Sequence, residues 1–317
     1  MGVMKVGVIG AGAVGRACVL SMLQRGSCRE IVLVNRSRER AAGAATDMRY
    51  GRPLSAAVDV SDGDYHDLNG ADLVMITAGA NEQSGGATDR DDPRGRLRLL
   101  EGNADVYREV VPRIVAAAPG AVLLVVTDPP DPLTDIAREL AGHERVFGTG
   151  TLIDSLRLRV HIGQQLGVDA AAIDAMVVGE HGTSSVTLWS SAMVAGVPVT
   201  ELLALGDRPV GQVQAEIEQD VRDANITIIE GIGASQYGIG IVSARLAEAV
   251  LRDEASVFPV SSHHDDYQVS LSLPAVVGRS GVQRTLAPHM SDEEDNELAR
   301  SAQVLREALH GVDARRP

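Results

Sequence analysis

The sequence predicts an α/β protein in which a doubly wound parallel sheet over residues 1–150 is followed by an α+β domain over residues 151–317. Short apolar strand patterns alternate with helical patterns in the first half, which is typical of a parallel sheet with helices on both faces. The second half instead mixes helices with a hairpin-like pattern. The length of 317 residues also favours two domains, because it exceeds what one core usually serves.

The first half contains four apolar stretches that predict strands, at residues 4–9, 31–34, 73–77 and 122–126. Helical patterns lie at about 14–24 and 106–118. The segment 88–98 is polar and rich in Asp and Arg, and it interrupts the alternation between strand and helix. Long polar segments of this kind are often functional, so we expect a mobile loop here.

The second half has a different periodicity. Helices are predicted at about 154–166, 211–231, 236–251 and 293–309. A short strand is expected at 176–178 and β-hairpin material at 269–277. This mixture predicts an α+β substrate or catalytic domain.

Composition excludes several classes of partner. The formal net charge of −14 disfavours nucleic acid and anionic membranes and leaves a small molecule as the expected partner. The two cysteines form no disulfide framework, and we expect Cys18 to be buried and Cys28 to lie at the surface. No signal-peptide pattern or membrane-length apolar run is present, so we expect a cytoplasmic protein.

A glycine-rich segment follows the first strand and opens the first helix. Its residues Gly10, Gly12, Ala13, Val14 and Gly15 form the pattern G-x-G-x-x-G. In this context the pattern is the fingerprint of a Rossmann dinucleotide-binding fold, because the glycines allow a tight turn and a close approach of the pyrophosphate to the helix N-terminus. The alternative, a turn that binds nothing, is disfavoured by the flanking strand and helix.

The end of the second predicted strand bears on the type of cofactor. NAD sites usually carry an acidic residue there, which bonds the ribose 2′-hydroxyl, whereas this chain has Asn35. Arg36, Ser37 and Arg38 follow, and they could bind a 2′-phosphate. The pattern therefore predicts NADP(H) in preference to NAD(H). The alternative is that these arginines only begin a solvated helix.

Three side chains in the second half suggest acid–base chemistry. Asp154 and Arg157 lie three residues apart on a predicted helix and so share one face. His181 lies between glycines after a strand. A His paired with a carboxylate is a general acid–base unit, and an Arg beside it offers a fork for a substrate carboxylate.

At these residues the chain resembles the lactate/malate dehydrogenase family, of the L-2-hydroxy acid dehydrogenase type. The resemblance extends over most of the chain, and the order and separation of its segments are more specific than any one of them. Beside the glycine fingerprint, it rests on the segments 77–80, 128–134, 148–157, 179–182, 233–240 and 273–278.

The resemblance implies a reductase that moves a hydride between NADP(H) and a small 2-oxo or 2-hydroxy acid. His181 would donate and accept the proton, Asp154 would orient it, and Arg157 would bind the substrate carboxylate. Arg96 would polarise the reacting carbonyl, although Arg90, Arg94 and Arg98 are close by, and Ser235 would line the substrate pocket. Three further cofactor-binding residues are implied: Thr77, Ala78 and Gly79.

The chain departs from the family pattern at Asp128, where the family has Asn before the first proline. An ionised Asp128 would repel an anionic substrate. Either Asp128 is protonated in a low-dielectric site, or the substrate is unusual. The resemblance also implies a cis bond between Asp128 and Pro129. The active-site loop is longer than usual, so the side-chain selector is either Glu82 or a residue near Asp89 or Arg90.

Two alternatives to keto-acid reduction remain. The same scaffold could reduce an imine or a specialised biosynthetic intermediate, or the chain could be a nucleotide-binding paralogue without catalysis. No metal is expected, because the segment His263–Asp266 is more typical of a solvated loop than of a metal site. Members of the family are usually dimers or tetramers, so we expect a homodimer or homotetramer.

Overall fold

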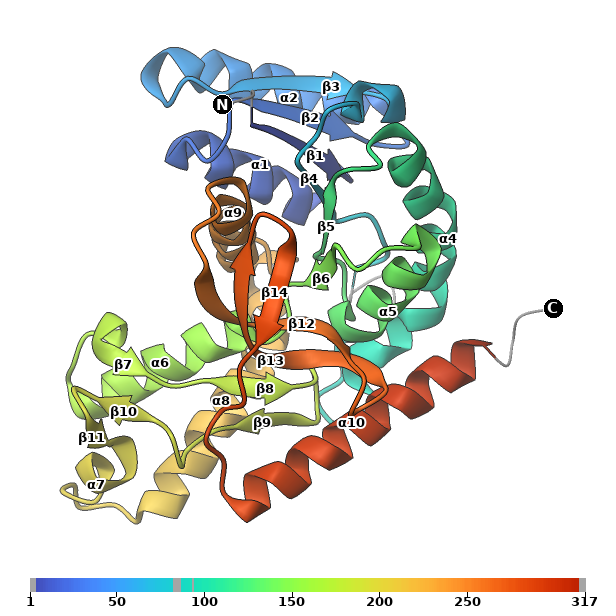
Figure 1. Cartoon of the computed structure of the whole chain (residues 1–317). Helices are drawn as coiled ribbons and strands as arrows, with labels where there is room; N and C mark the ends of the chain where they lie inside the picture. Colours follow the sequence, from blue (N-terminus) through green and yellow to red (C-terminus); the bar gives the residue numbers. More distant parts are fainter. Residues whose placement is uncertain (1–3, 82–86, 93, 314–317) are drawn as a thin grey trace.

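The computed structural model describes residues 4–81, 87–92 and 94–313, and it has the predicted architecture of a doubly wound sheet followed by an α+β half (Figure 1). Six parallel strands lie in the order β3-β2-β1-β4-β5-β6, which is the strand order of a dinucleotide-binding fold. Their bounds are β1 Lys5–Ile9, β2 Glu30–Val34, β3 Asp59–Gly63, β4 Leu73–Ile76, β5 Val122–Val125 and β6 Val146–Gly148.

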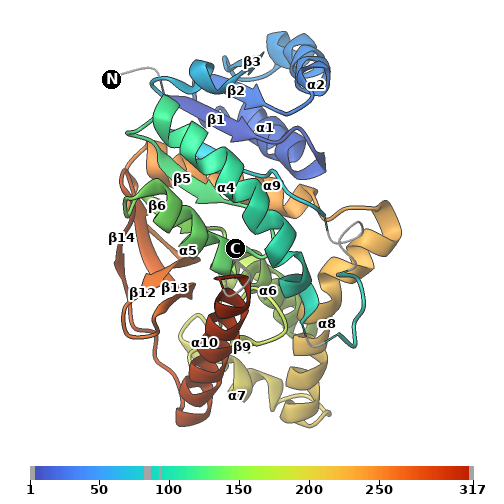
Figure 2. The same ribbon diagram turned by 90° about the vertical axis from the view of Figure 1, so that its right-hand side faces the viewer.

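Helices cover both faces of this sheet, and each face has its own apolar core. One core packs α1, α2 and α9 against the strands, and the other packs α4 and α5 (Figure 2). The bounds are α1 Ala13–Arg25, α2 Arg38–Gly51, α4 Leu100–Ala117, α5 Pro130–Ala141 and α9 Tyr237–Leu251. Short 3-10 helices lie at η1 Arg52–Leu54, η2 Tyr65–Leu68 and η3 Gly95–Leu99.

The sheet continues from β6 into the second half through antiparallel strands in the order β12-β13-β8-β9, with β14 on β13. Their bounds are β8 Val177–Gly179, β9 Ser185–Thr187, β12 Ser256–His264, β13 Val269–Gly278 and β14 Gly281–Thr285. A separate three-stranded sheet contains β7 Ile173–Asp174, β10 Met193–Val194 and β11 Val197–Pro198.

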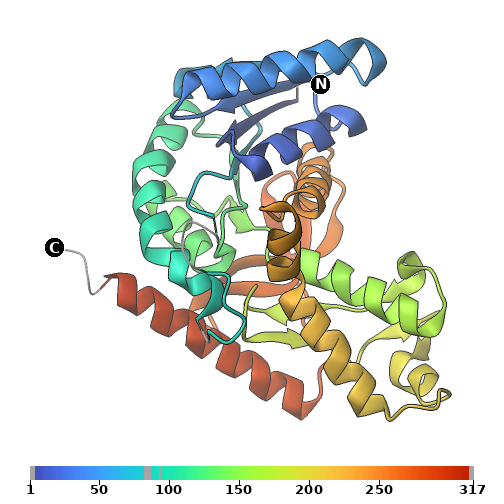
Figure 3. The same cartoon turned by 180° about the vertical axis from the view of Figure 1, so that it is seen from behind.

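The remaining helices surround this half. From behind, α8 runs beside α6, and the two helices pack on a shared apolar cluster (Figure 3). The bounds are α6 Leu152–Leu166, η4 Ala170–Ala172, α7 Val199–Leu203, α8 Val210–Ile232 and α10 Asp292–Asp313. No helix of the described residues is long and apolar enough to cross a membrane.

Two expectations about the first half were wrong. The helix predicted at 106–118 begins earlier, at Leu100, because Leu100, Asn103 and Ala104 already face the core at helical spacing. Cys28 is buried, not exposed, with 2% of its surface accessible. It lies in the turn between α1 and β2 and packs into the core with the residues of both elements.

The expectation of a solvated loop at His263–Asp266 was also wrong at its first two residues. His263 and His264 end β12, and His263 Nδ1 lies 2.7 Å from Oδ1 of the buried Asp135. Ser270 bonds the same carboxylate through its backbone N–H and its hydroxyl. The segment therefore closes a polar network between β12, β13 and α5.

Candidate active site

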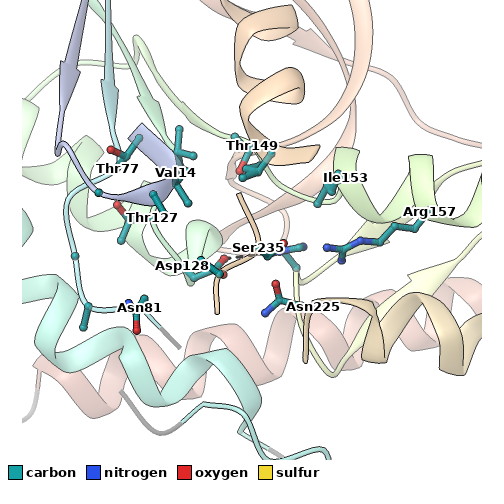
Figure 4. Close-up of a pocket in the computed structure, with 18 residues that line it drawn as sticks. Val14, Thr77, Asn81, Thr127, Asp128, Thr149, Ile153, Arg157, Asn225 and Ser235 are labelled. Atoms are coloured by element: carbon teal, nitrogen blue, oxygen red, sulfur yellow. Dashed lines mark ion pairs between the residues drawn. The ribbon is translucent and has the colours of Figure 1, made fainter. Parts of the chain in front are cut away.

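A cavity lies where the carboxyl ends of β1, β4 and β5 meet α6 and α8, and it holds about 930 Å³ of empty space including its mouth. Ligands bind at this edge of doubly wound sheets. Figure 4 shows side chains of both halves around the same space. The predicted site residues among its lining are Gly12, Ala13, Val14, Thr77, Gly79, Asp128, Arg157, His181 and Ser235.

The glycine loop fits a dinucleotide. Gly10 has φ +112°, a conformation that other residues rarely adopt, and Thr77 closes the turn by donating its hydroxyl to the carbonyl oxygens of Ile9 and Gly10. A Cβ on Gly15 would lie 1.9 Å from Gly10 O, so the helix packs directly on the loop. A Cβ on Gly12 would meet no protein atom within 4 Å. The open space before the α1 N-terminus suits a pyrophosphate.

The residues after β2 are engaged in local structure. Asn35 Oδ1 accepts from the N–H of Ala11 at 3.0 Å, and Asn35 Nδ2 donates to Ser37 O at 2.9 Å. Ser37 caps α2 and also donates to Glu39. Arg38 pairs with Asp62 at 3.3 Å, whereas Arg36 is exposed. Of the predicted 2′-phosphate ligands, Ser37 and Arg38 therefore already have structural partners.

Asp154, Arg157 and His181 come together as the sequence predicts. Asp154 lies in the first turn of α6, where Oδ2 accepts a hydrogen bond from His181 Nδ1 and Oδ1 lies 3.0 Å from Arg157 Nη1. Both Asp154 and His181 are buried. Burial alone would raise the pKa of Asp154, but His181, Arg157 and Arg96 outweigh it and hold the pKa well below its usual range. Asp154 is thus an anion that fixes the imidazole.

A buried acid that sequence analysis missed holds the backbone of His181. Asp131, in the first turn of α5, accepts from the His181 N–H at 2.7 Å, and Ser272 Oγ donates to it at 3.3 Å. Burial raises the pKa of Asp131 to about 7, although the bond from His181 opposes the rise. Asp131 lies in the segment 128–134 that carries the family resemblance, but an acid in a first helical turn resembles an ordinary N-terminal acid, so its role was not predicted.

Arg96 pairs with Asp128, which lines the cavity, while Arg96 itself is not among the lining residues. Arg96, on η3, places Nε 3.3 Å from Asp128 Oδ2, and His181 Nε2 lies 3.7 Å from Asp128 Oδ1. The side chains of Arg96 and Asp128 are only 11% and 21% exposed. The Asp128–Pro129 bond is cis, as predicted. Asn103 fixes the loop after β5, because its Nδ2 donates to Asp128 O at 2.7 Å while its Oδ1 accepts from the N–H of Ala80.

Of the remaining residues predicted to bind the substrate, one lines the cavity and another does not. Ser235 lines the cavity beside Asn225, a buried residue of α8 that the sequence analysis did not single out (Figure 4). Arg90 is not among the lining residues, because its guanidinium forms a bidentate pair with Glu230 on α8, at 2.6 and 2.8 Å. Glu82 lies outside the described residues.

Among the described residues, no group of three metal-ligating side chains could hold a metal ion.

Known proteins resemble the chain over nearly its whole length. An L-lactate dehydrogenase of Deinococcus radiodurans is 47% identical over 96% of this chain and 97% of its own, and one of Chloroherpeton thalassium is 43% identical over 98% and 100%. Among solved structures, a lactate dehydrogenase enzyme from a Medee basin deep-sea metagenome library has a TM-score of 0.90 at 32% identity, covering 99% of this chain and 100% of that one.

Two family models match the chain in succession. The model described as lactate/malate dehydrogenase, NAD binding domain, matches residues 4–148, and the model described as lactate/malate dehydrogenase, alpha/beta C-terminal domain, matches residues 151–315. Together with the relatives and the shared fold, these matches identify the chain as a member of the lactate/malate dehydrogenase family, and hence as a nicotinamide-dependent dehydrogenase.

Proposed function

We propose that the chain interconverts a small 2-oxo acid and its L-2-hydroxy acid, with pyruvate and L-lactate as the first pair to test. The observation that carries this proposal is that His181 and Arg157, both bound to Asp154, line a cavity that also contains the glycine loop. Relatives named L-lactate dehydrogenase support pyruvate as the first substrate. In this proposal residues 1–150 bind the cofactor, and residues 151–317 supply the acid–base pair and Arg157.

The geometry defines a role for each side chain. A bound nicotinamide would supply the hydride. Because the Asp154 carboxylate only accepts, His181 carries a proton on Nδ1, and its Nε2 is the atom that gives a proton to the substrate oxygen. Arg157 binds the substrate carboxylate through its fork, and Arg96 stabilises the negative charge that develops on the oxygen. In the reverse direction, neutral His181 takes the hydroxyl proton at Nε2.

The first prediction concerns turnover. The purified chain should consume reduced cofactor with pyruvate or another 2-oxo acid, and His181→Asn should lower kcat about 10²–10⁴-fold because the general acid is lost. Cofactor binding, measured by nicotinamide fluorescence, should be unchanged. Full turnover in the His181→Asn variant would reject the mechanism, whereas a wild type that binds the cofactor but turns over no substrate would favour a binding protein without catalysis.

An imine substrate is the second candidate, because Asp128 Oδ1 lies 3.7 Å from His181 Nε2 and a carboxylate there would tolerate a cationic group. The Arg96–Asp128 pair favours the keto acid instead, since the charge of Asp128 already has a counter-ion within the chain. The same assay with cyclic imines distinguishes the two. Turnover of an imine without turnover of any 2-oxo acid would overturn the first candidate.

We also propose that the cofactor is NADP(H) in preference to NAD(H). The absence of an acid at position 35 removes the group that would repel a 2′-phosphate, and the exposed Arg36 follows directly. Arg36→Gln should lower kcat/KM for NADPH about tenfold or more while changing NADH little. Arg40→Gln, on the first turn of α2, is the matched control. A wild type that prefers NADH would reject this proposal.

A homodimer is the proposed assembly, with a tetramer as the larger alternative. Exposed apolar side chains lie on α9 and on the two helices that pack against it, α1 and α6, and surfaces of this kind commonly mark contacts between proteins. These side chains are Leu20, Leu156, Val160, Tyr237 and Ile241. A second copy of the chain is the occupant that the family resemblance favours.

A further inference from the structure

We propose that Asp128 is an internal competitor for Arg96, so that a 2-oxo acid must displace a carboxylate of the chain itself before Arg96 can bind its carbonyl oxygen. The inference rests on the proposed function. Its geometric basis is that Asp128 bridges the two groups assigned to that oxygen, with Oδ2 3.3 Å from Arg96 Nε and Oδ1 3.7 Å from His181 Nε2.

The charges around His181 explain why this bridge matters. Asp154 and Arg157 approach from α6, Arg96 from η3, Asp128 from the loop after β5, and Asp131 from the first turn of α5. Asp154 is the counter-ion of Arg157, and Asp128 is the counter-ion of Arg96. Each of these two arginines therefore faces a carboxylate of the chain before any substrate arrives.

Burial makes it hard for a substrate to replace Asp128 as the partner of Arg96. With 11% and 21% of the side chains exposed, water and salt screen the pair less than they would on the surface. The full charge of a carboxylate attracts a guanidinium more strongly than the dipole of a neutral carbonyl oxygen does. The substrate carbonyl thus competes poorly for Arg96, and contacts made elsewhere, chiefly at Arg157, must offset the exchange.

Replacing Asp128 with its neutral isostere separates charge from shape. Asparagine keeps the size of the side chain and leaves the backbone carbonyl that accepts from Asn103 in place. It removes the charge that holds Arg96. Asp128→Asn should therefore strengthen binding of an anionic substrate analogue, and the part of the gain that comes from releasing Arg96 should vanish when Arg96 is replaced.

The test is a double-mutant cycle with oxamate, an unreactive analogue of pyruvate, bound to the protein with its reduced cofactor. Its Kd is followed by nicotinamide fluorescence in the wild type, Asp128→Asn, Arg96→Gln and the double variant. Asp128→Asn should lower Kd about tenfold or more when Arg96 is present and about twofold or less when it is absent. Asp128→Ser repeats the measurement should the first variant fail to fold.

Each other outcome overturns the inference. An unchanged or weaker affinity in Asp128→Asn means that Asp128 does not compete for Arg96, and an equal gain with and without Arg96 means that Asp128 only repels the ligand. Asp92→Asn is the control, because Asp92 pairs with Arg98 on the same segment outside the cavity lining, and it should leave Kd unchanged. Turnover of pyruvate and a panel of other 2-oxo acids by the wild type is measured alongside. Its absence with every acid overturns the proposed function and the inference together, whereas turnover with unchanged oxamate binding overturns the inference alone.

Discussion

His181 is held at two points by residues from different parts of the chain. Asp154 fixes the ring through Nδ1, and Asp131 fixes the backbone through its N–H. Both carboxylates are buried and lie in first helical turns, where the helix dipole favours negative charge. The orientation of Nε2 is thus set before a ligand binds, which is what a general acid requires.

A second His–Asp pair, away from the cavity lining, should make stability depend on pH. The hydrogen bond with Asp135 raises the pKa of His263 above its ordinary value. The resulting stabilisation is complete below the unfolded-chain pKa of about 6.5 and is lost as the pH rises through the folded-state pKa. His263→Asn should therefore lower Tm more at about pH 5.5 than at about pH 8.5, as measured by calorimetry.

The neighbouring His264 provides a control with the opposite sign. Burial lowers its pKa, so protonation of His264 opposes folding, and the wild type loses that much stability as the pH falls. The Tm difference between His264→Asn and the wild type should become less negative at acid pH. Parallel trends in the two variants would show that the His263–Asp135 pair is not responsible for the pH dependence of stability.

At the scale of elements, the junction of β1 and α1 shows how a tight loop creates a ligand site. Gly15 is required by contact within the protein, since its α-carbon hydrogen faces Gly10 O, whereas Gly12 borders open space. The two glycines therefore serve different purposes, one in packing and the other in leaving room for a ligand. Variants at the two positions should separate these purposes.

Gly12→Ala should keep the Tm of the chain without cofactor but weaken cofactor binding, because φ −73° suits alanine and the added methyl enters the ligand space. Gly15→Ala should lose about 1–3 kcal/mol of unfolding free energy as well as binding, since its methyl overlaps Gly10 O. Thermal denaturation and nicotinamide fluorescence measure the two effects. Equal losses of stability in both variants would contradict this division.

At the scale of the whole molecule, one hydrogen-bonded sheet joins the two halves. β6 pairs with β12 at Gly148 and Ser261, and β13 pairs with β8 at Ser272 and Gly179. Asp128 follows β5 and His181 follows β8, so both groups extend from the same framework. Their separation is therefore fixed by the sheet and does not depend on how two independent domains dock.

The proposed dimer makes a prediction at this scale. Ile241→Arg, on α9, should convert the assembly to monomers, because a charge in an apolar contact is costly to bury. Leu205→Arg, at a residue 84% exposed beyond α7, is the control and should leave the mass unchanged. Light scattering after size-exclusion chromatography gives the mass. A monomeric wild type would reject the dimer.

How much could be predicted from the sequence varies between regions. The strands around the cofactor loop follow from apolar periodicity, and the shared face of Asp154 and Arg157 follows from their spacing. The pairing of His181 with Asp154 follows from the family resemblance. β3 was missed because this edge strand, Asp-Val-Ser-Asp-Gly, lacks a continuous apolar pattern, and α2 was missed because only Ala41 and Ala45 of it are buried. The pairing of Arg90 with Glu230 joins residues 140 positions apart, so no local pattern reports it.

The bonds of Asn35 bear on how coenzyme choice could change during evolution. Asn35→Asp, the exchange expected to favour the other coenzyme, would keep an acceptor for Ala11 but would lose the donor to Ser37 O and set two oxygens against each other. We therefore expect Asn35→Asp to lower the stability of the protein unless the turn before α2 changes as well. Any exchange at position 35 is thus coupled to the backbone of that turn and does not act on the coenzyme alone.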